Sequence, residues 1–244
     1  MPVAVGVAAL ADRLRALCGA RGGLVVGLTG SVASGKSTLA GQLVDRLTPE
    51  LHVEAVSTDG FLFSNAELER RGLLERKGFP ESYDRESLAR AIAELRLGEA
   101  LFPGYSHEIY DIDPAASRRV ERPDLLILEG LGHSAPSAPP RCSGEPDLLI
   151  YVDAAFEDLE SWYTERFVRL WRAAEHDPGS FYRRFRQMSE EEVVAFARQV
   201  WAAVNLPNLT GHIAPLREHA DLVVLRRTDL SLVVTADRSE SLLR

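Results

Sequence analysis

The chain has 244 residues, of which 45% are hydrophobic and 26% are charged. These values indicate a globular α/β protein with a sizeable core, organised as a single domain over 1–244. The formal net charge of −8 argues against a nucleic-acid partner or an anionic membrane surface. Cys18 and Cys142 lie far apart without nearby cysteine or histidine partners, which argues against a disulfide framework or a zinc site and favours a cytoplasmic location.

The predicted elements begin with an amphipathic helix over Val7–Leu17, since the apolar start is too short for a membrane span and lacks the layout of a signal peptide. Buried strands are predicted from five short apolar runs: Leu24–Thr29, Val53–Ser57, Leu125–Leu128, Leu148–Val152 and Leu222–Leu225. Because these runs are almost continuously apolar, both faces of the sheet are expected to be covered, as in a parallel sheet.

Helical patterns separate the predicted strands. Apolar residues recur at helical spacing in three segments: Leu39, Leu43 and Leu47; Leu88, Ile92 and Leu95; and Val193, Phe196, Val200 and Val204. The last segment follows a capping box of Ser189 and Glu192. This alternation predicts a layered α/β fold. The proline-containing stretch Ser134–Gly144 is typical of an exposed loop, and Val233-Val234 favours a last edge strand.

The segment Gly30-Ser-Val-Ala-Ser-Gly35-Lys36-Ser37 matches G-x4-G-K-[ST] and lies between a predicted strand and a predicted helix. In such a P-loop, backbone N–H groups surround phosphate oxygens, the lysine reaches the β- and γ-phosphates and the serine hydroxyl binds Mg²⁺. The chain contains only two lysines, and Lys36 is one of them. The predicted nucleotide-binding residues are Gly30, Ser31, Val32, Ala33, Ser34, Gly35, Lys36, Ser37 and Thr38, with ATP and Mg²⁺ as the expected nucleotide and ion.

Two carboxylates follow the second and third predicted strands. Asp59, in Thr58-Asp59-Gly60-Phe61, is placed to accept the proton of a hydroxyl that attacks the γ-phosphate. The alternative is that Asp-Gly only forms a turn. Glu129 ends the run Leu126–Leu128 and is a candidate for holding Mg²⁺, with a turn or capping role as its alternative.

An arginine-rich segment and an aromatic segment complete the candidate site. Arg166, Arg169 and Arg172 recur every three residues, so they are predicted to share a helical face, and one of them is expected to neutralise charge on the transferring phosphate. The segment Tyr105–Asp111 concentrates aromatic and imidazole groups. Both segments have ordinary structural explanations when considered alone.

Together, these residues resemble bacterial type I pantothenate kinases, within the phosphoribulokinase/uridine kinase group. The matching segments are Gly30–Thr38, Thr58–Leu62, Lys77–Asp84, Tyr105–Asp111, Asp124–Leu131, Tyr151–Ala154, Trp162–Phe167, Asn205–Leu209 and Ile213–Arg217. They run in the family's order over about 24–225. The P-loop is generic, whereas Lys77–Asp84 and Tyr105–Asp111 are much more specific.

The resemblance implies a three-layer P-loop kinase fold, with a mainly parallel sheet flanked by helices, that phosphorylates the primary hydroxyl of pantothenate on the route to coenzyme A. It implies that Asp59 is the general base and that Lys36 and Arg166 stabilise the phosphoryl group. The residues implied to line the acceptor site are Asp59, Tyr105, His107, Tyr110, Tyr163 and Asn205, and Ser37 and Glu129 are the implied metal site. A homodimer with feedback inhibition by coenzyme A is also implied.

The sequence departs from the family at positions that bear on the acceptor and on feedback. Gly41 replaces an arginine that pairs with a coenzyme A phosphate in the family. Leu170 and Glu175 stand where the family has a phenylalanine-rich wall, and the family's asparagine after the Glu-Gly-Leu segment is replaced, which gives Gly132-His133. The stretch before the first strand is also shorter than in those enzymes.

Two alternatives therefore stay open. One is a kinase of the same group that acts on a nucleoside such as uridine or on a sugar, and Glu175 and His133 are the features that favour it. The other is a nucleotide-binding regulator without turnover, against which the set of Asp59, Glu129 and Arg166 argues.

Overall fold

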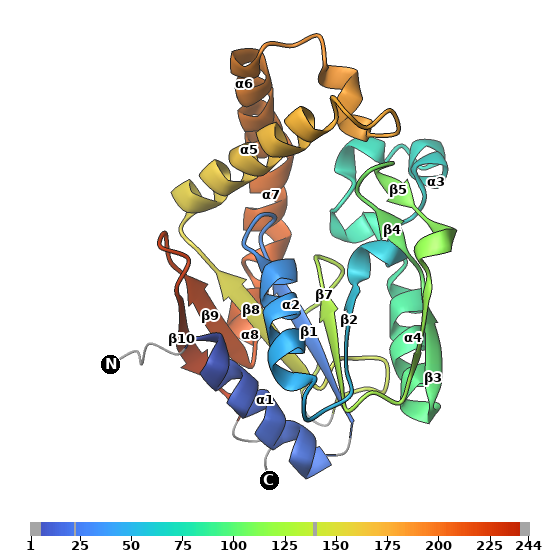
Figure 1. The fold of residues 1–244 in the computed structure, drawn as a ribbon. Coiled ribbons are helices and arrows are strands. Elements are labelled where there is room, and N and C mark those ends of the chain that lie inside the picture. The colour runs from blue at the N-terminus through green and yellow to red at the C-terminus, as the bar shows by residue number, and fades with distance from the viewer. Residues whose placement is uncertain (1–5, 22, 139–140, 240–244) are drawn as a thin grey trace.

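The protein is described by a computed structural model that covers residues 6–21, 23–138 and 141–239. At its centre lies a six-stranded sheet in the order β10-β9-β8-β1-β7-β2 (Figure 1). Its strands are β1 (Leu24–Gly30), β2 (Val53–Ser57), β7 (Leu125–Glu129), β8 (Leu148–Asp153), β9 (Leu222–Arg226) and β10 (Leu232–Asp237). Neighbours pair in parallel, except that β10 runs antiparallel to β9 at the edge.

Helices cover both faces of this sheet. On one face, α1 (Val7–Arg21) and α2 (Lys36–Leu47) bury leucines at helical spacing against the inward side chains of the strands. On the other face, α4 (Arg85–Leu97) packs against β1 and β7, and α8 (Leu216–His219) packs near β8 and β9. The predicted three-layer α/β fold with a mainly parallel sheet is therefore confirmed.

The remaining elements gather beyond the carboxyl ends of the strands (Figure 1). They comprise α3 (Asn65–Arg70), the short hairpin of β4 (Tyr105–Ser106) and β5 (Asp111–Ile112), α5 (Phe156–Ala173), α6 (Glu190–Val200) and α7 (Leu206–Asn208), while β3 (Glu99–Phe102) pairs with β6 (Arg118–Glu121) beside α4. Single π-helical turns, Trp201–Asn205 and Leu209–Ile213, flank α7. Such turns occur often at functional sites. Both belong to the group of elements beyond the carboxyl ends of the strands, where ligands bind in parallel α/β folds.

The predicted boundaries agree with the structure to within a few residues. The strand Val53–Ser57 is as predicted, whereas the other four central strands each continue one residue further, to Gly30, Glu129, Asp153 and Arg226. Their backbones stay paired although the side chains are no longer apolar. Helix α1 continues beyond the predicted Val7–Leu17 to residue 21. The capping box of Ser189 and Glu192 is present, and Val233-Val234 lies in edge strand β10.

The predicted loop Ser134–Gly144 forms no helix or strand where the structure describes it, and residues 139–140 lie outside the described part. Across residues 6–21, 23–138 and 141–239, no helix is both long enough and apolar enough to cross a bilayer. The division of the chain into a single domain over 1–244 stays a prediction.

Candidate active site

The loop between β1 and α2 turns tightly around the amino end of α2. Gly35 adopts φ +85°, a left-handed conformation that favours glycine. Lys36 is buried, and its Nζ lies 3.2 Å from the carbonyl oxygen of Gly30 and 2.8 Å from that of Ser31. Burial lowers the pKa of Lys36, while the nearby carboxylates of Glu129 and Asp59 oppose this effect. The loop therefore holds a cation and a helix amino end together, as an anion site requires.

Beside this loop lies a cavity of about 200 Å³. The phosphate-binding loop contributes Val32, Ala33, Lys36 and Ser37 to its lining, whereas Gly30, Ser31, Ser34, Gly35 and Thr38 lie in the loop without lining it. The cavity is also lined by the predicted catalytic, acceptor and metal residues Asp59, Tyr105, His107, Tyr110, Glu129, Tyr163, Arg166 and Asn205. The structure thus brings together residues that are up to about 170 positions apart.

The two carboxylates are set side by side by the register of the sheet. Ser57 at the end of β2 pairs with Glu129 at the end of β7, and Asp59 follows in a one-turn 3-10 helix, η1 (Thr58–Phe61). The Ser37 hydroxyl donates to Glu129 Oε1 at 3.0 Å, and the Tyr83 hydroxyl donates to Asp59 Oδ1 at 3.0 Å. Burial raises the pKa of Glu129, whereas Lys36 lowers it.

The hairpin β4–β5 forms one wall of the cavity. The Tyr105 ring packs edge-on against His107 at 5.2 Å and against Tyr110 at 6.3 Å between centroids. Lys77 anchors this wall, because its Nζ donates to the carbonyl oxygen of Tyr110 and to Asn65 Oδ1, both at 2.6 Å. Burial lowers the pKa of Lys77 to about 8, although the carboxylates of Asp111 and Asp59 oppose this.

The facing wall comes from α5 and from the π-helical segment. Tyr163 is hydrogen-bonded to Asn205, and burial raises its pKa to about 12. Arg166 lines the cavity. The predicted shared face of three arginines is wrong in part: Arg169 is exposed, and Arg172 binds Glu190 at 2.6 Å on the surface. On a helix, positions three and six residues further along rotate progressively away from the first, so one arginine of the three faces the site.

The two residues that favoured a different acceptor do not lie on the cavity. Helix α5 ends at Ala173, and Glu175 is exposed beyond it. His133 is buried beneath the sheet, where its Nε2 lies 2.8 Å from the carbonyl oxygen of Leu128, and burial lowers its pKa to about 4. Leu170 does line the cavity, as expected for residues four apart on a helix that also presents Arg166.

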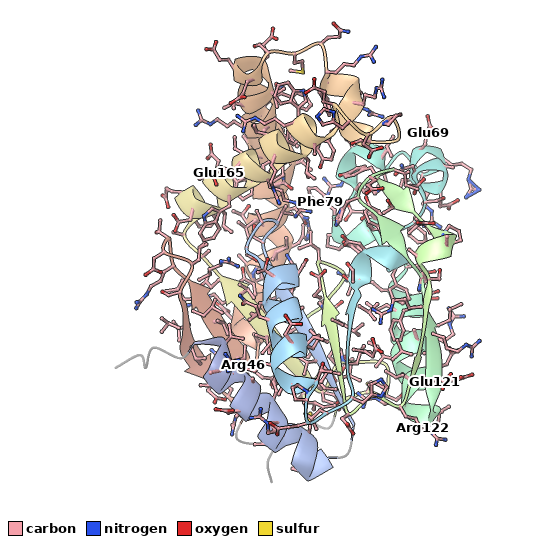
Figure 2. All side chains as sticks on the ribbon, viewed as in Figure 1. Arg46, Glu69, Phe79, Glu121, Arg122 and Glu165 are labelled. Carbon is pink, nitrogen blue, oxygen red and sulfur yellow. The ribbon has the colours of Figure 1, made fainter. Side chains whose placement is uncertain are left out.

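Sequence reasoning assigned no site role to several other residues that line the cavity, among them the polar residues Lys77, Tyr83, Tyr182 and Asn208. Lys77 and Tyr83 lie in the specific segment Lys77–Asp84, and the scarcity of lysine pointed to Lys77. In Figure 2 the labelled Phe79 marks this segment, and its ring contacts His212 of the last π-helical turn at 5.7 Å between centroids. Asn208 Nδ2 donates to the carbonyl oxygen of Gly78 at 2.8 Å, which joins the segment to the facing wall.

The sequence model of the phosphoribulokinase/uridine kinase family matches residues 25–171, a range that contains the phosphate loop, both carboxylates and Arg166. The chain belongs to this family. It is an ATP-dependent kinase, and the reaction requires a divalent metal ion and a small-molecule acceptor.

Curated relatives extend this similarity beyond the family match. The chain is 48% identical over 218 residues to a pantothenate kinase of Clavibacter sepedonicus, covering 85% of this chain and 68% of that protein. It is 45% identical to a pantothenate kinase of Streptomyces coelicolor, covering 84% of this chain and 66% of that protein. The chain therefore spans about two thirds of the length of these relatives.

Solved structures agree on the fold of this kinase family. A candidate fructose transport system kinase from Silicibacter sp. TM1040 superposes with a TM-score of 0.65 and 25% identity, covering 88% of this chain and 98% of that one. A D-glycerate 3-kinase from Cryptococcus neoformans superposes with a TM-score of 0.61 and 16% identity, covering 93% of this chain and 97% of that one. The latter identity supports the shared fold alone.

Proposed function

We propose that this kinase transfers the γ-phosphate of ATP to the primary hydroxyl of pantothenate, the reaction that opens coenzyme A biosynthesis. The observation that carries the proposal is the single cavity on which the phosphate loop, Asp59 and the predicted acceptor residues converge. The 43–48% identity to curated pantothenate kinases supports the same acceptor.

In this mechanism, Asp59 accepts the proton of the acceptor hydroxyl as its oxygen forms a bond to the γ-phosphorus of ATP. The bond between that phosphorus and the bridging oxygen breaks, and ADP leaves. Lys36 and Arg166 face the same cavity and stabilise the charge on the transferring group, which is the main contribution a protein makes to phosphoryl transfer. Tyr105, His107, Tyr110, Tyr163 and Asn205 orient the acceptor.

We assign the metal site to Ser37 and Glu129, and Mg²⁺ to that site. Their side-chain oxygens are 3.0 Å apart at the amino end of α2. The described residues contain no group of three or more His, Cys, Asp or Glu side chains that forms a protein cage for an ion. A site that offers only a few protein oxygens beside a phosphate suits Mg²⁺, because this ion keeps several of its waters and binds phosphate oxygens as well. When bound, Mg²⁺ neutralises charge on the β- and γ-phosphates.

The test is a panel of acceptors offered to the purified protein with ATP and Mg²⁺: pantothenate, uridine, fructose and glycerate. We expect kcat/KM to be highest for pantothenate, and Asp59→Asn to abolish ADP formation while ATP binding persists. A tenfold preference for uridine or a sugar would replace the proposed acceptor. ATP binding without ADP formation from any acceptor would instead indicate a regulator.

A homodimer and inhibition by coenzyme A remain proposals that rest on the family resemblance. Light scattering tests for the homodimer. Titration of coenzyme A into the kinase assay, with ADP formation as the readout, tests for the inhibition. Gly41 lies on the exposed face of α2 with no atom within 4 Å of the position its Cβ would take. Since no arginine side chain stands there to bind a phosphate, we expect weak inhibition.

A further inference from the structure

The segment Lys77–Asp84 was singled out by its sequence, yet the reaction assigns no role to Tyr83, a buried side chain of this segment that lines the cavity. This tyrosine is 5% exposed, and its ring packs among apolar side chains between η1 and α4. The one hydrogen bond of its hydroxyl within the described residues is the 3.0 Å contact with Asp59 Oδ1. The hydroxyl of this buried phenol therefore forms its hydrogen bond with the candidate base.

Backbone pairing holds the tyrosine in register with the base. Tyr83 forms an antiparallel bridge with Leu62, which lies three residues after Asp59. On either side of this bridge, the N–H of Phe63 donates to the carbonyl oxygen of Ser82 at 2.9 Å, and the N–H of Asp84 donates to that of Phe61 at 2.7 Å. These two main-chain hydrogen bonds form the bridge, and they fix the position of the Tyr83 ring relative to Asp59.

The direction of the hydrogen bond is also fixed. Burial raises the pKa of Tyr83 well above its usual value, and the nearby Asp59 carboxylate raises it further. The phenol thus keeps its proton and acts as the donor, while the carboxylate accepts through Oδ1. A carboxylate has two oxygens that accept hydrogen bonds, so Oδ2 is left for the hydroxyl of the acceptor.

Two cations near Asp59 indicate why a hydrogen bond from Tyr83 to its carboxylate matters. The ammonium groups of Lys36 and Lys77 both interact electrostatically with Asp59 from different sides of the cavity. A carboxylate that rotates freely about its last side-chain bond turns towards either cation and directs its lone pairs away from the acceptor. The charged or titratable groups that interact with Asp59 are Lys36, Lys77, Tyr83, Tyr105, His107, Tyr110 and Glu129.

We propose that Tyr83 is a positioning residue for phosphoryl transfer, which holds Asp59 through Oδ1 so that Oδ2 faces the acceptor hydroxyl. This inference rests on the proposed role of Asp59 as base. Misplacing a catalytic group by about 1 Å costs on the order of a hundredfold in rate, and here the perturbation is a rotation rather than a loss of the group. We therefore expect a loss of kcat of roughly ten- to a hundredfold.

The test is Tyr83→Phe, which keeps the ring and removes the hydroxyl. We expect kcat to fall by that factor while the KM values for ATP and acceptor stay within about twofold, since the Tyr83 hydroxyl is already engaged by Asp59 Oδ1. The melting temperature should stay close to that of the wild type, because the ring that packs in the core is kept. Tyr151→Phe is the matched control: Tyr151 is 3% exposed on β8 and does not line the cavity, so its kcat should be unchanged.

A wild-type kcat in Tyr83→Phe would overturn the inference. A fall in kcat accompanied by an equal rise in both KM values and a lower melting temperature would also overturn it, because that pattern indicates a packing role. Asp59→Asn, measured in parallel, separates the two proposals: if it retains activity, the assignment of the base is wrong, whereas an inactive Asp59→Asn beside a fully active Tyr83→Phe refutes the positioning role alone.

Discussion

Gly60 follows the candidate base directly and is the position where the smallest substitution should have the largest effect on catalysis. A Cβ at this position would lie 1.8 Å from the carbonyl oxygen of Pro103 and 2.6 Å from its carbonyl carbon. Both obstacles are backbone atoms at the start of the hairpin that carries Tyr105. Because contacts below 3.0 Å are not tolerated, Gly60→Ala must separate η1 from the hairpin by about 1.2 Å.

This displacement affects both the candidate base and the acceptor site. It moves Asp59 relative to the hairpin whose Tyr105, His107 and Tyr110 line the acceptor cavity. A shift of about 1 Å corresponds to a loss of about a hundredfold in kcat/KM, and overpacking costs about 1–3 kcal/mol of stability. Steady-state kinetics with ATP and pantothenate, together with urea unfolding, measure both quantities.

Gly41→Ala is the matched control, since it makes the same chemical change in helix α2, where no atom lies within 4 Å of the added Cβ. We expect unchanged kinetics and a gain of about 0.5–1 kcal/mol in the free energy of unfolding. If Gly60→Ala has wild-type kcat/KM, the close approach of η1 and the hairpin is not a requirement of the active site.

Three further changes test other parts of the structure. The pKa of Lys77 is lowered to about 8 in the folded protein, so between pH 8 and 10.5 the unfolded chain keeps a proton that the folded chain has lost. The free energy of unfolding of the wild type, measured with urea relative to Lys77→Met, should therefore rise over this pH range. Asp221→Ala leaves the Arg141 guanidinium, bound at 2.6 Å and 9% exposed, without its partner and should cost about 3–5 kcal/mol, against less than about 1 kcal/mol for the exposed Arg172→Ala. Glu129→Gln should raise the Mg²⁺ concentration for half-maximal activity, and excess EDTA should abolish wild-type turnover.

The fold was predictable because the signals that encode it are local. Burial follows directly from the helical spacing of Leu39, Leu43 and Leu47 and from the apolar strand runs. The phosphate-loop motif also predicts a strand before it and a helix after it. The carboxylates at 59 and 129 were also accessible to sequence reasoning, because parallel strands end at the same edge of a sheet. Convergence of the more distant residues on one cavity was expected only through the family resemblance.

Other features of the site depend on pairing between distant segments. Tyr83 reaches Asp59 because it bridges Leu62, and no periodic pattern in the sequence encodes that bridge. Glu175 was misjudged because the family resemblance placed it in the phenylalanine-rich wall, whereas α5 ends at Ala173 and Glu175 is exposed beyond it. His133 was misjudged because the chain after Glu129 lines the cavity only as far as Leu131, and the His133 ring is buried beside the carbonyl oxygen of Leu128 instead.

The four strands whose predicted ends fell one residue short have a common cause. Hydropathy stops at the last apolar residue, but backbone pairing continues to Gly30, Glu129, Asp153 and Arg226. Two of these extra positions contact the phosphate loop: Glu129 meets Ser37 at 3.0 Å, and the Arg226 guanidinium lies 3.4 Å from the carbonyl oxygens of Ser34 and Gly35. In this sheet hydropathy therefore places the strand ends too early, because backbone pairing continues whether or not the side chain is apolar, and at Glu129 the extra paired position holds a residue of the cavity.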